Sequence, residues 1–244
     1  MHSTHRPIRI WFWAAYLVTT HTPGISALQL QQQLGISKID SAWFLLHRLR
    51  QGMVRNDRDP LSGLIEADET YIGGPAKGKK GRGVTEFVNK TLVIGAVEVK
   101  TYRNKEGQSE EEVGRFRLKT ICSAGETEIK KFLNSNVVAG SAIRTDVWQG
   151  YSTTALKGYN HIRQIQGNPE KAKQLALHIR KVFGNLQSWL NGIHHGGDPK
   201  YMQAYLDEFV FRFNRREHPM AAFLRLLGIV VSKQPFTHND LTKP

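Results

Sequence analysis

The chain has 244 residues, enough to bury a hydrophobic core, and 40% of them are hydrophobic, which excludes an intrinsically disordered protein. Lysine and arginine number 34 against 21 acidic residues, and the net charge of +13 favours a polyanionic partner. The single cysteine, Cys122, excludes an intrachain disulfide and a multi-cysteine zinc site, and no apolar run reaches the roughly 20 residues of a membrane span.

The apolar segment near the N-terminus, IRIWFWAAYLV, is short and lacks the small-residue cleavage site of a signal peptide. We therefore expect a cytoplasmic protein with no membrane partner. Cys122 follows an apolar run, GRFRLKTIC, and is expected to be an inert residue in the core of a strand.

Residues 8–54 are predicted to be helical, beginning with IRIWFWAAYLVTT (8–20). ISALQLQQQLGI follows, with Ser26 as its N-cap, and a turn at Gly35 leads to KIDSAWFLLHRLRQGM. Two short helices joined by a glycine turn have the spacing of a helix-turn-helix, although helical hairpins without DNA-binding activity are also common. We expect residues 1–56 to form a DNA-binding domain.

Polar residues 55–63 mark a boundary, after which the pattern changes to strands. Five strands are predicted, at GLIEADETYIG (63–73), KTLVIGAVEVK (90–100), GRFRLKTIC (114–122), GSAIRTDVWQGY (140–151) and NHIRQIQG (160–167). A long polar loop over 101–114 is expected between the second strand and the third. A helix is predicted at 125–137, and the chain from Pro169 onward is predicted to be helical.

This order of strands and helices is that of a ribonuclease-H-like α/β fold, with a mixed five-stranded sheet flanked by helices. Other α/β folds remain compatible with the pattern. We expect residues 57–199 to form this domain and residues 200–244 to form a helical extension that packs on its core.

The glycine-rich segment IGGPAKGKKGRG resembles a phosphate-binding loop from Gly73 to Lys79. The next residue is Lys80 where such a loop needs serine or threonine, and no helix follows, so a nucleotide-binding loop is excluded. Two interpretations remain: a linker between strands, or an arm that contacts the DNA backbone through Lys77, Lys79, Lys80 and Arg82.

Two carboxylates indicate a metal site. Asp68 and Glu69 are adjacent in a predicted strand and point to opposite faces. Asp146 lies where the fourth strand enters a turn, and the first and fourth strands are neighbours in a ribonuclease-H-like sheet. Asp68 and Asp146 would then lie side by side and need a cation between them, for which the oxygen-binding Mg²⁺ is suitable.

Several segments together resemble one family: GISALQLQQQLGIS, IEADETYIGG, TDVWQGY, GIHHG and YLDEFVFRFNRR. They look like bacterial insertion-sequence transposases with an ISXO-like DDE catalytic domain, over nearly the whole chain. The resemblance implies a helix-turn-helix, a ribonuclease-H-like core and two Mg²⁺ ions, for which Mn²⁺ can substitute. It also implies that Asp68 and Asp146 are the first two catalytic carboxylates. The N-terminal zinc ribbon usual in this family is missing from the sequence.

The third catalytic position is less clear, because its expected helix offers no acidic residue. We favour His178, 32 residues after Asp146, as catalytic residue and metal ligand, since some groups of the family have histidine or asparagine there. Asn185, two helical turns further along, is the second choice. Glu208 ranks below both as a structural residue, and Gln187 stands where the family has a basic residue.

The resemblance implies a Mg²⁺-dependent, nucleoid-associated transposase that cleaves the ends of its element and transfers the 3′-hydroxyl into target DNA. Two ends must meet, so a dimer or larger assembly on DNA is expected. The terminal inverted repeats would be recognised through residues 26–52, with further contacts elsewhere; the predicted DNA-binding side chains include Lys38, Arg48, Arg212 and Arg215. The alternatives are an inactive transposase relic that only binds DNA, and a ribonuclease H.

Overall fold

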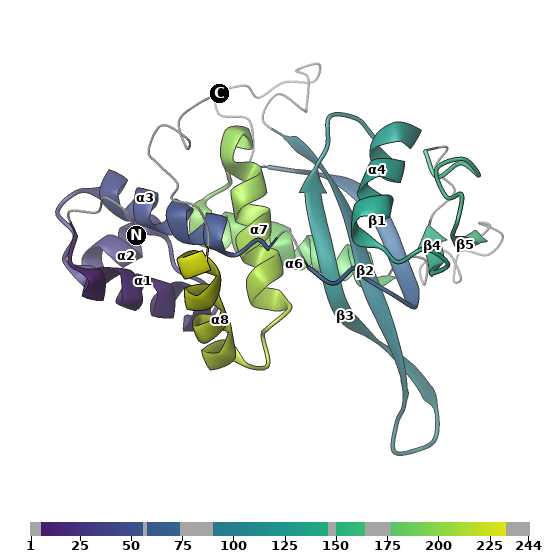
Figure 1. The fold of residues 1–244 in the computed structure, drawn as a ribbon, viewed down its shortest axis with the longest axis horizontal. Helices are drawn as coiled ribbons and strands as arrows, with labels where there is room; N and C mark the ends of the chain where they lie inside the picture. The colour runs from purple at the N-terminus through teal and green to yellow at the C-terminus, as the bar shows by residue number, and fades with distance from the viewer. Residues whose placement is uncertain (1–5, 56–57, 74–89, 146–149, 164–176, 233–244) are drawn as a thin grey trace. The chain divides into compact units, whose positions relative to one another are not determined.

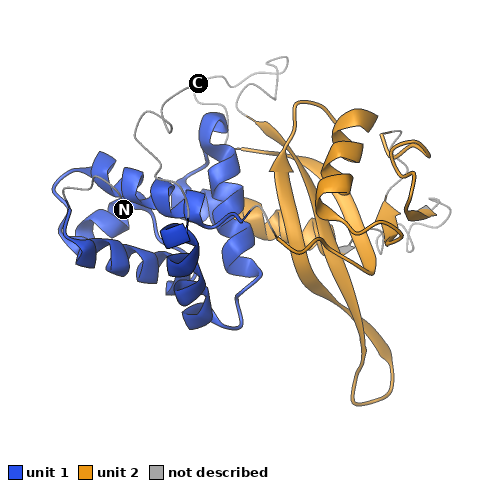
Figure 2. Cartoon of the chain, in the orientation of Figure 1, with its two compact units in different colours: residues 1–57, 189–244 blue, residues 58–188 orange. Residues whose placement is uncertain are grey.

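A computed structural model describes residues 6–55, 58–73, 90–145, 150–163 and 177–232 (Figure 1). The chain divides into two compact units (Figure 2). Unit 1 combines residues 1–57 with 189–244, and unit 2 comprises residues 58–188.

Unit 1 is helical. Its elements are α1 (Ile8–Thr20), α2 (Ala27–Leu34), α3 (Ile39–Gly52), a 3-10 turn η1 (Pro199–Tyr201), α7 (Met202–Phe213) and α8 (Pro219–Ser232). One hydrophobic cluster takes side chains from α1, α3, α7 and α8, including Trp11, Leu46, Phe211 and Leu226. The helical N-terminal region is therefore confirmed, and its core is completed by residues from the other end of the chain.

The caps of α2 explain where this helix begins and ends. The Ser26 hydroxyl accepts a hydrogen bond from the Gln29 amide at 3.2 Å, and the Gln29 side chain accepts one from the Ser26 amide at 3.0 Å. Gly35 ends the helix with φ of +62°, a conformation that glycine adopts without steric cost. The predicted N-cap and glycine turn before α3 are confirmed.

Unit 2 is built on a five-stranded sheet with the strand order β3-β2-β1-β4-β5. Its strands are β1 (Leu64–Ile72), β2 (Thr91–Arg103), β3 (Ser109–Thr120), β4 (Ala142–Thr145) and β5 (Asn160–Arg163). The first three strands pair antiparallel, whereas β4 pairs parallel with both β1 and β5. This is the predicted mixed sheet of a ribonuclease-H-like α/β fold, with the first and fourth strands as neighbours.

Helices pack on both faces of the sheet. On one face, Ile129 and Phe132 of α4 (Glu126–Asn136) join a cluster with Ile65 and Ala67 of β1. The other face carries the first turns of α6 (Leu177–His194). There, a Cβ added to Gly95 of β2 would lie within 3.0 Å of side chains of Ile179, Leu118 and Phe183, so a glycine allows the helix to pack closely.

Two predictions about the end of the sheet are wrong. The strands β2 and β3 extend to Arg103 and Ser109, so the turn covers residues 104–108 and not 101–114. Cross-strand contacts explain the extra length, since Tyr102 donates a hydrogen bond to Glu110 at 2.6 Å. Cys122 was expected in a buried strand, but β3 ends at Thr120 and Cys122 is exposed.

The compact units differ from the predicted domain boundaries. The apolar side chains of Phe211, Ala222 and Leu226 are buried among α1 and α3, within unit 1. The predicted extension over 200–244 thus contributes its described helices to the core of the N-terminal helices.

Candidate active site

Asp68 lies in the middle of β1, on the face covered by α6. Its Oδ1 accepts a hydrogen bond from the Glu69 amide at 2.9 Å, and its Oδ2 is 3.7 Å from Nε of Arg180 in α6. The side chain is 14% exposed, so solvent reaches the carboxylate. Glu69 belongs to the opposite face, where it accepts a hydrogen bond from the Tyr151 hydroxyl at 2.8 Å. The two neighbouring carboxylates thus point apart, as the strand pattern predicted.

The strand β4 runs parallel to β1, with Arg144 opposite Glu66. In the sequence, Asp146 directly follows Thr145, the last residue of β4. Asp146 itself lies outside the described residues, and so do the predicted DNA-contacting residues Lys77, Lys79, Lys80 and Arg82.

Glu66, two residues before Asp68 on the same face of β1, ties the strand to the start of α6. Its side chain is fully buried and accepts hydrogen bonds from the backbone amides of His178 and Ile179, at 2.8 and 3.1 Å. The amides in the first turn of a helix have no partner within the helix, and a carboxylate there also interacts favourably with the helix dipole. Glu66 therefore caps α6 from the sheet.

The same carboxylate belongs to a larger ionic network. Oε1 of Glu66 is 3.0 Å from Nδ1 of His178 and 3.0 Å from Nη1 of Arg144. Arg144 also binds Glu111 of β3 through both terminal nitrogens, at 3.0 and 3.1 Å. The hydrogen bond with Arg144 lowers the pKa of Glu111, and the hydrogen bond with Glu111 raises that of Arg144.

Ligand atoms of Glu66, Glu111 and His178 all lie within 4.8 Å of one another, a spacing that could hold a metal ion. Arg144 already supplies positive charge to both carboxylates, which removes the electrostatic need for a cation. This arrangement favours a structural network beside the candidate active site. The sequence analysis missed Glu66, Glu111 and Arg144; the one available signal was that Glu66 shares the face of Asp68 two residues away.

A family comparison complements this geometry. The model of the ISXO2-like transposase domain matches residues 60–214, more than half of the chain. The chain belongs to the ISXO2-like transposases. No curated protein matches the sequence significantly. Membership in this transposase family implies a nucleic-acid-modifying enzyme that binds DNA and uses divalent metal. In the described part of the chain, no helix combines the length and apolarity needed to cross a bilayer.

The positions considered for the third transposase ligand differ in their surroundings. His178 is buried, and its Nδ1 faces Glu66. Asn185, two turns further along α6, is exposed. Between α6 and the end of β1, Gln187 donates a hydrogen bond from Nε2 to the carbonyl of Gly73 at 3.3 Å.

Glu208 lies in unit 1 and has a different set of partners. It is fully buried in α7, where Oε2 accepts a hydrogen bond from Nε of Arg50 at 2.7 Å. Its Oε1 lies 3.7 Å from Arg212, and Arg212 donates to the His21 carbonyl at 2.6 Å. These contacts favour structural roles for Glu208 and also for Arg212, which was predicted to contact DNA. Burial lowers the pKa of Arg212.

Three other residues predicted to contact DNA are also described. Lys38 is exposed at the N-cap of α3. The guanidinium of Arg48 lies 5.8 Å from the centre of the Trp11 ring, and that of Arg215 lies 4.1 Å from the centre of the Phe211 ring. Each arginine is partly buried against an aromatic ring.

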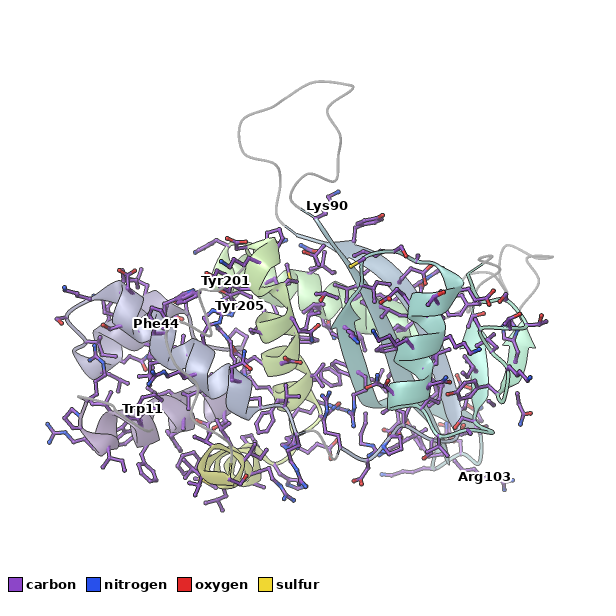
Figure 3. All side chains as sticks on the ribbon, turned by 45° about the horizontal axis from the view of Figure 1, so that its top comes forward. Trp11, Phe44, Lys90, Arg103, Tyr201 and Tyr205 are labelled. Carbon is purple, nitrogen blue, oxygen red and sulfur yellow. The ribbon has the colours of Figure 1, made fainter. Side chains whose placement is uncertain are left out.

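A buried histidine in α3 is surrounded by aromatic rings. The centroid of the His47 ring lies 3.9 Å from that of Trp43, 5.4 Å from that of Tyr201 and 5.5 Å from that of Tyr205. Tyr201 and Tyr205 are labelled in Figure 3. Within the described part of the chain, neither ring nitrogen of His47 has a hydrogen-bond partner. Burial, together with the charge of Arg50, lowers the pKa of His47 to about 2. Burial likewise lowers the pKa of His194 to about 4.

Proposed function

We propose that the chain is a catalytically active DNA transposase that cleaves DNA at the ends of its element and joins the ends to target DNA. One observation carries the proposal: in a member of the transposase family, the solvent-accessible Asp68 lies on a strand that is paired in parallel with β4. Glu66 of β1 is paired with Arg144 of β4. In the sequence, Asp68 comes two residues after Glu66, and Asp146 comes two residues after Arg144.

In this proposal, Asp68 and Asp146 hold two Mg²⁺ ions, or Mn²⁺ in their place, together with a third residue of α6. Carboxylate oxygens are the ligands that Mg²⁺ prefers, and the Asp68 carboxylate is accessible to an ion. When bound, two such metals lower the pKa of an attacking oxygen and stabilise a leaving oxygen. The Glu69 amide fixes Oδ1 of Asp68, so the carboxylate is held in one orientation before substrate arrives.

The reaction consists of two displacements at phosphorus. Water attacks first, and the bond from phosphorus to the 3′-oxygen breaks, which exposes a 3′-hydroxyl at the end of the element. That hydroxyl then attacks a phosphorus of target DNA, with release of a second 3′-oxygen. Neither displacement requires a covalent enzyme intermediate.

For the third ligand, we rank Asn185 ahead of His178, the reverse of the order predicted from sequence. Glu66 engages Nδ1 of His178, so only Nε2 remains for a metal, and imidazole nitrogen is a poorer ligand for Mg²⁺ than oxygen. Asn185 is exposed and offers an amide oxygen. The arrangement of His178 resembles that of a metal-bound histidine oriented by a carboxylate, so it stays the second candidate.

Recognition of the terminal repeats is assigned to residues 26–52. Lys38 is exposed at the start of α3, where the recognition helix of a helix-turn-helix contacts bases. Arg48 and Arg215 would reach the DNA backbone, as would the lysines and arginine of residues 77–82. Because two element ends must be joined, we expect a dimer or larger assembly on DNA.

The test is a nicking assay on duplex DNA that carries the terminal repeats from the genomic flanks of the gene. Asp68→Asn and Asp146→Asn should each abolish cleavage in Mg²⁺ and in Mn²⁺ while duplex binding persists. Asn185→Ala should reduce cleavage by at least about 100-fold and more than His178→Ala does. Cleavage by either aspartate variant would disprove the metal-site assignment. If the wild-type chain binds DNA but never nicks it, the chain is the non-catalytic relic.

A further inference from the structure

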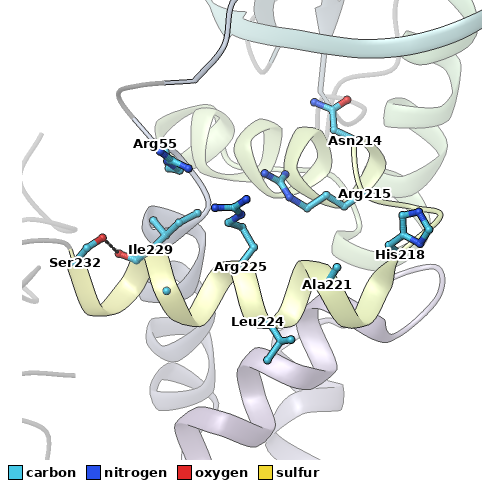
Figure 4. A pocket seen from close by; sticks show the side chains of 10 residues that line it. Arg55, Asn214, Arg215, His218, Ala221, Leu224, Arg225, Ile229 and Ser232 are labelled. Carbon is cyan, nitrogen blue, oxygen red and sulfur yellow. Dashed lines mark hydrogen bonds between the residues drawn. The ribbon is translucent and has the colours of Figure 1, made fainter.

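The α7–α8 corner of unit 1 contains a hollow of about 940 Å³ that the proposed active site does not use (Figure 4). It is lined by the segment after α3, the turn between α7 and α8, and α8 itself. Its polar lining consists of Arg55, Asn214, Arg215, His218, Arg225 and Ser232.

The hollow concentrates positive charge. Three of its lining residues are arginines, and none of the described residues that line it is acidic. In Figure 4, the guanidinium of Arg225 is drawn between those of Arg55 and Arg215. Arginines on one concave surface repel one another, and an anion bound among them relieves this repulsion.

One of the three guanidinium groups is held in position by the last turn of α7. Nη1 of Arg215 donates to the carbonyl of Phe211 at 3.1 Å, and the guanidinium lies 4.1 Å from the centre of the Phe211 ring. An arginine fixed in this way loses less conformational entropy when it binds a ligand. Arg225 is exposed on α8 and therefore accessible from solvent.

The surface of α8 leaves room for a ligand to approach. Ala221 has only a methyl side chain, and Gly228 has none. Outside the nearby backbone of α8, a Cβ added to Gly228 would meet no atom within 4 Å. A bulky, multiply charged chain can therefore come close to the helix backbone. Guanidinium groups bind phosphodiester oxygens through paired N–H donors, so the lining fits the backbone of nucleic acid.

We propose that this hollow binds the phosphate backbone of double-stranded DNA, as a site separate from the metal-binding carboxylates and from α3. The choice of DNA as the polyanion rests on the proposed function. The contact is with the backbone, so it adds affinity without reading sequence, and it weakens as salt is raised.

The test uses the full chain and a random-sequence duplex, with affinity measured over a range of salt concentrations. Gly228→Glu places a carboxylate in the hollow, and Gly228→Gln adds a neutral side chain of the same size. Arg225→Glu reverses one charge of the lining, and Arg103→Glu makes the same change at an exposed arginine at the end of β2.

We expect Gly228→Glu and Arg225→Glu to weaken duplex binding by about tenfold and to reduce the salt slope by about one unit. Gly228→Gln and Arg103→Glu should stay within about twofold of the wild type. Equal affinities and slopes for all four variants would overturn the proposal. It would also be overturned if inorganic phosphate protected the wild type but not Gly228→Glu from thermal unfolding, with duplex affinity unchanged, since the hollow would then bind small anions only.

Nicking by the wild type and by Gly228→Glu is measured on the same preparations at saturating protein. A wild-type chain that never nicks, with a duplex affinity that depends on the hollow, refutes the proposed catalysis and leaves the backbone site standing. Normal nicking with unchanged affinities in all variants refutes the backbone site alone.

Discussion

At the residue scale, the buried carboxylate of Glu66 joins the strand that carries Asp68 to the helix that carries both candidates for the third ligand. It receives hydrogen bonds from two backbone amides of α6, from the His178 ring and from Arg144. Removing a buried carboxylate that accepts hydrogen bonds from four donors leaves several of these donors unsatisfied. Glu66 thus fixes the position of the first turn of α6 on β1.

Glu66→Gln should lower the free energy of unfolding by about 3 kcal/mol, because it removes one of the two carboxylates that pair with Arg144 and places an N–H₂ donor among existing donors. The measurement is urea unfolding at neutral pH. Glu112→Gln, an exposed position on β3, is the matched control and should change stability by less than about 0.5 kcal/mol. Similar losses in the two variants would contradict the role of Glu66.

The sequence indicated Asp68 but not Glu66, and the reason is physical. Asp68 was found through its place in a strand and through a motif shared with transposases. The role of Glu66 depends on His178, 112 residues away in the sequence, so it follows only from how the helix packs on the sheet. Arg144 and Glu111 were missed for the same reason, since they form an ion pair between two strands that are far apart in the sequence.

At the element scale, local rules predicted the helices well and the hairpin poorly. The bounds of α1 match the predicted segment, and α2 and α3 begin and end within two residues of expectation, because caps and apolar spacing are local signals. The hairpin of β2 and β3 is polar on both strands at its tip, so no hydrophobic alternation marks it. Pairs such as Tyr102 with Glu110 extend it, and such pairs appear only once the register is known.

Ser26→Ala should lower the free energy of unfolding by about 1 kcal/mol, because it removes the hydroxyl that accepts a hydrogen bond from the Gln29 amide. Ser37→Ala, at an exposed position in the turn before α3, is the control and should cost less than about 0.5 kcal/mol. Urea unfolding of both variants tests this. No loss in Ser26→Ala would show that the cap adds nothing to the stability of the fold.

At the scale of the whole molecule, two buried histidines make stability depend on pH. The pKa of His47 is lowered to about 2 and that of His194 to about 4, mainly by burial. The unfolded chain takes up these protons near the ordinary histidine pKa of about 6.5, whereas the folded chain does not. The contribution of these two histidines to the free energy of unfolding is therefore fully present above that value and is lost as the pH decreases below it.

Between pH 7.5 and pH 5.0, each of these histidines should lower the free energy of unfolding by about 2 kcal/mol. His47→Phe keeps an aromatic ring among Trp43, Tyr201 and Tyr205 but cannot be protonated, so this variant should lose about half of the pH dependence. The measurement is urea unfolding of wild type and variant at both pH values. An unchanged difference between the two pH values in the variant would rule out His47 as its source.

Because Gly95 has no side chain, α6 can pack closely on the sheet of unit 2. Gly95 pairs with Asp68 across the β1–β2 ladder, and Ile179 and Phe183 of α6 occupy the space that a methyl group would need. The methyl group of an alanine there would lie 2.9–3.0 Å from the side-chain ends of Ile179, Leu118 and Phe183, so these side chains would have to move. A single added carbon atom at this position would therefore disturb the packing of α6 on the β1–β2 strand pair, although every ionisable group is retained.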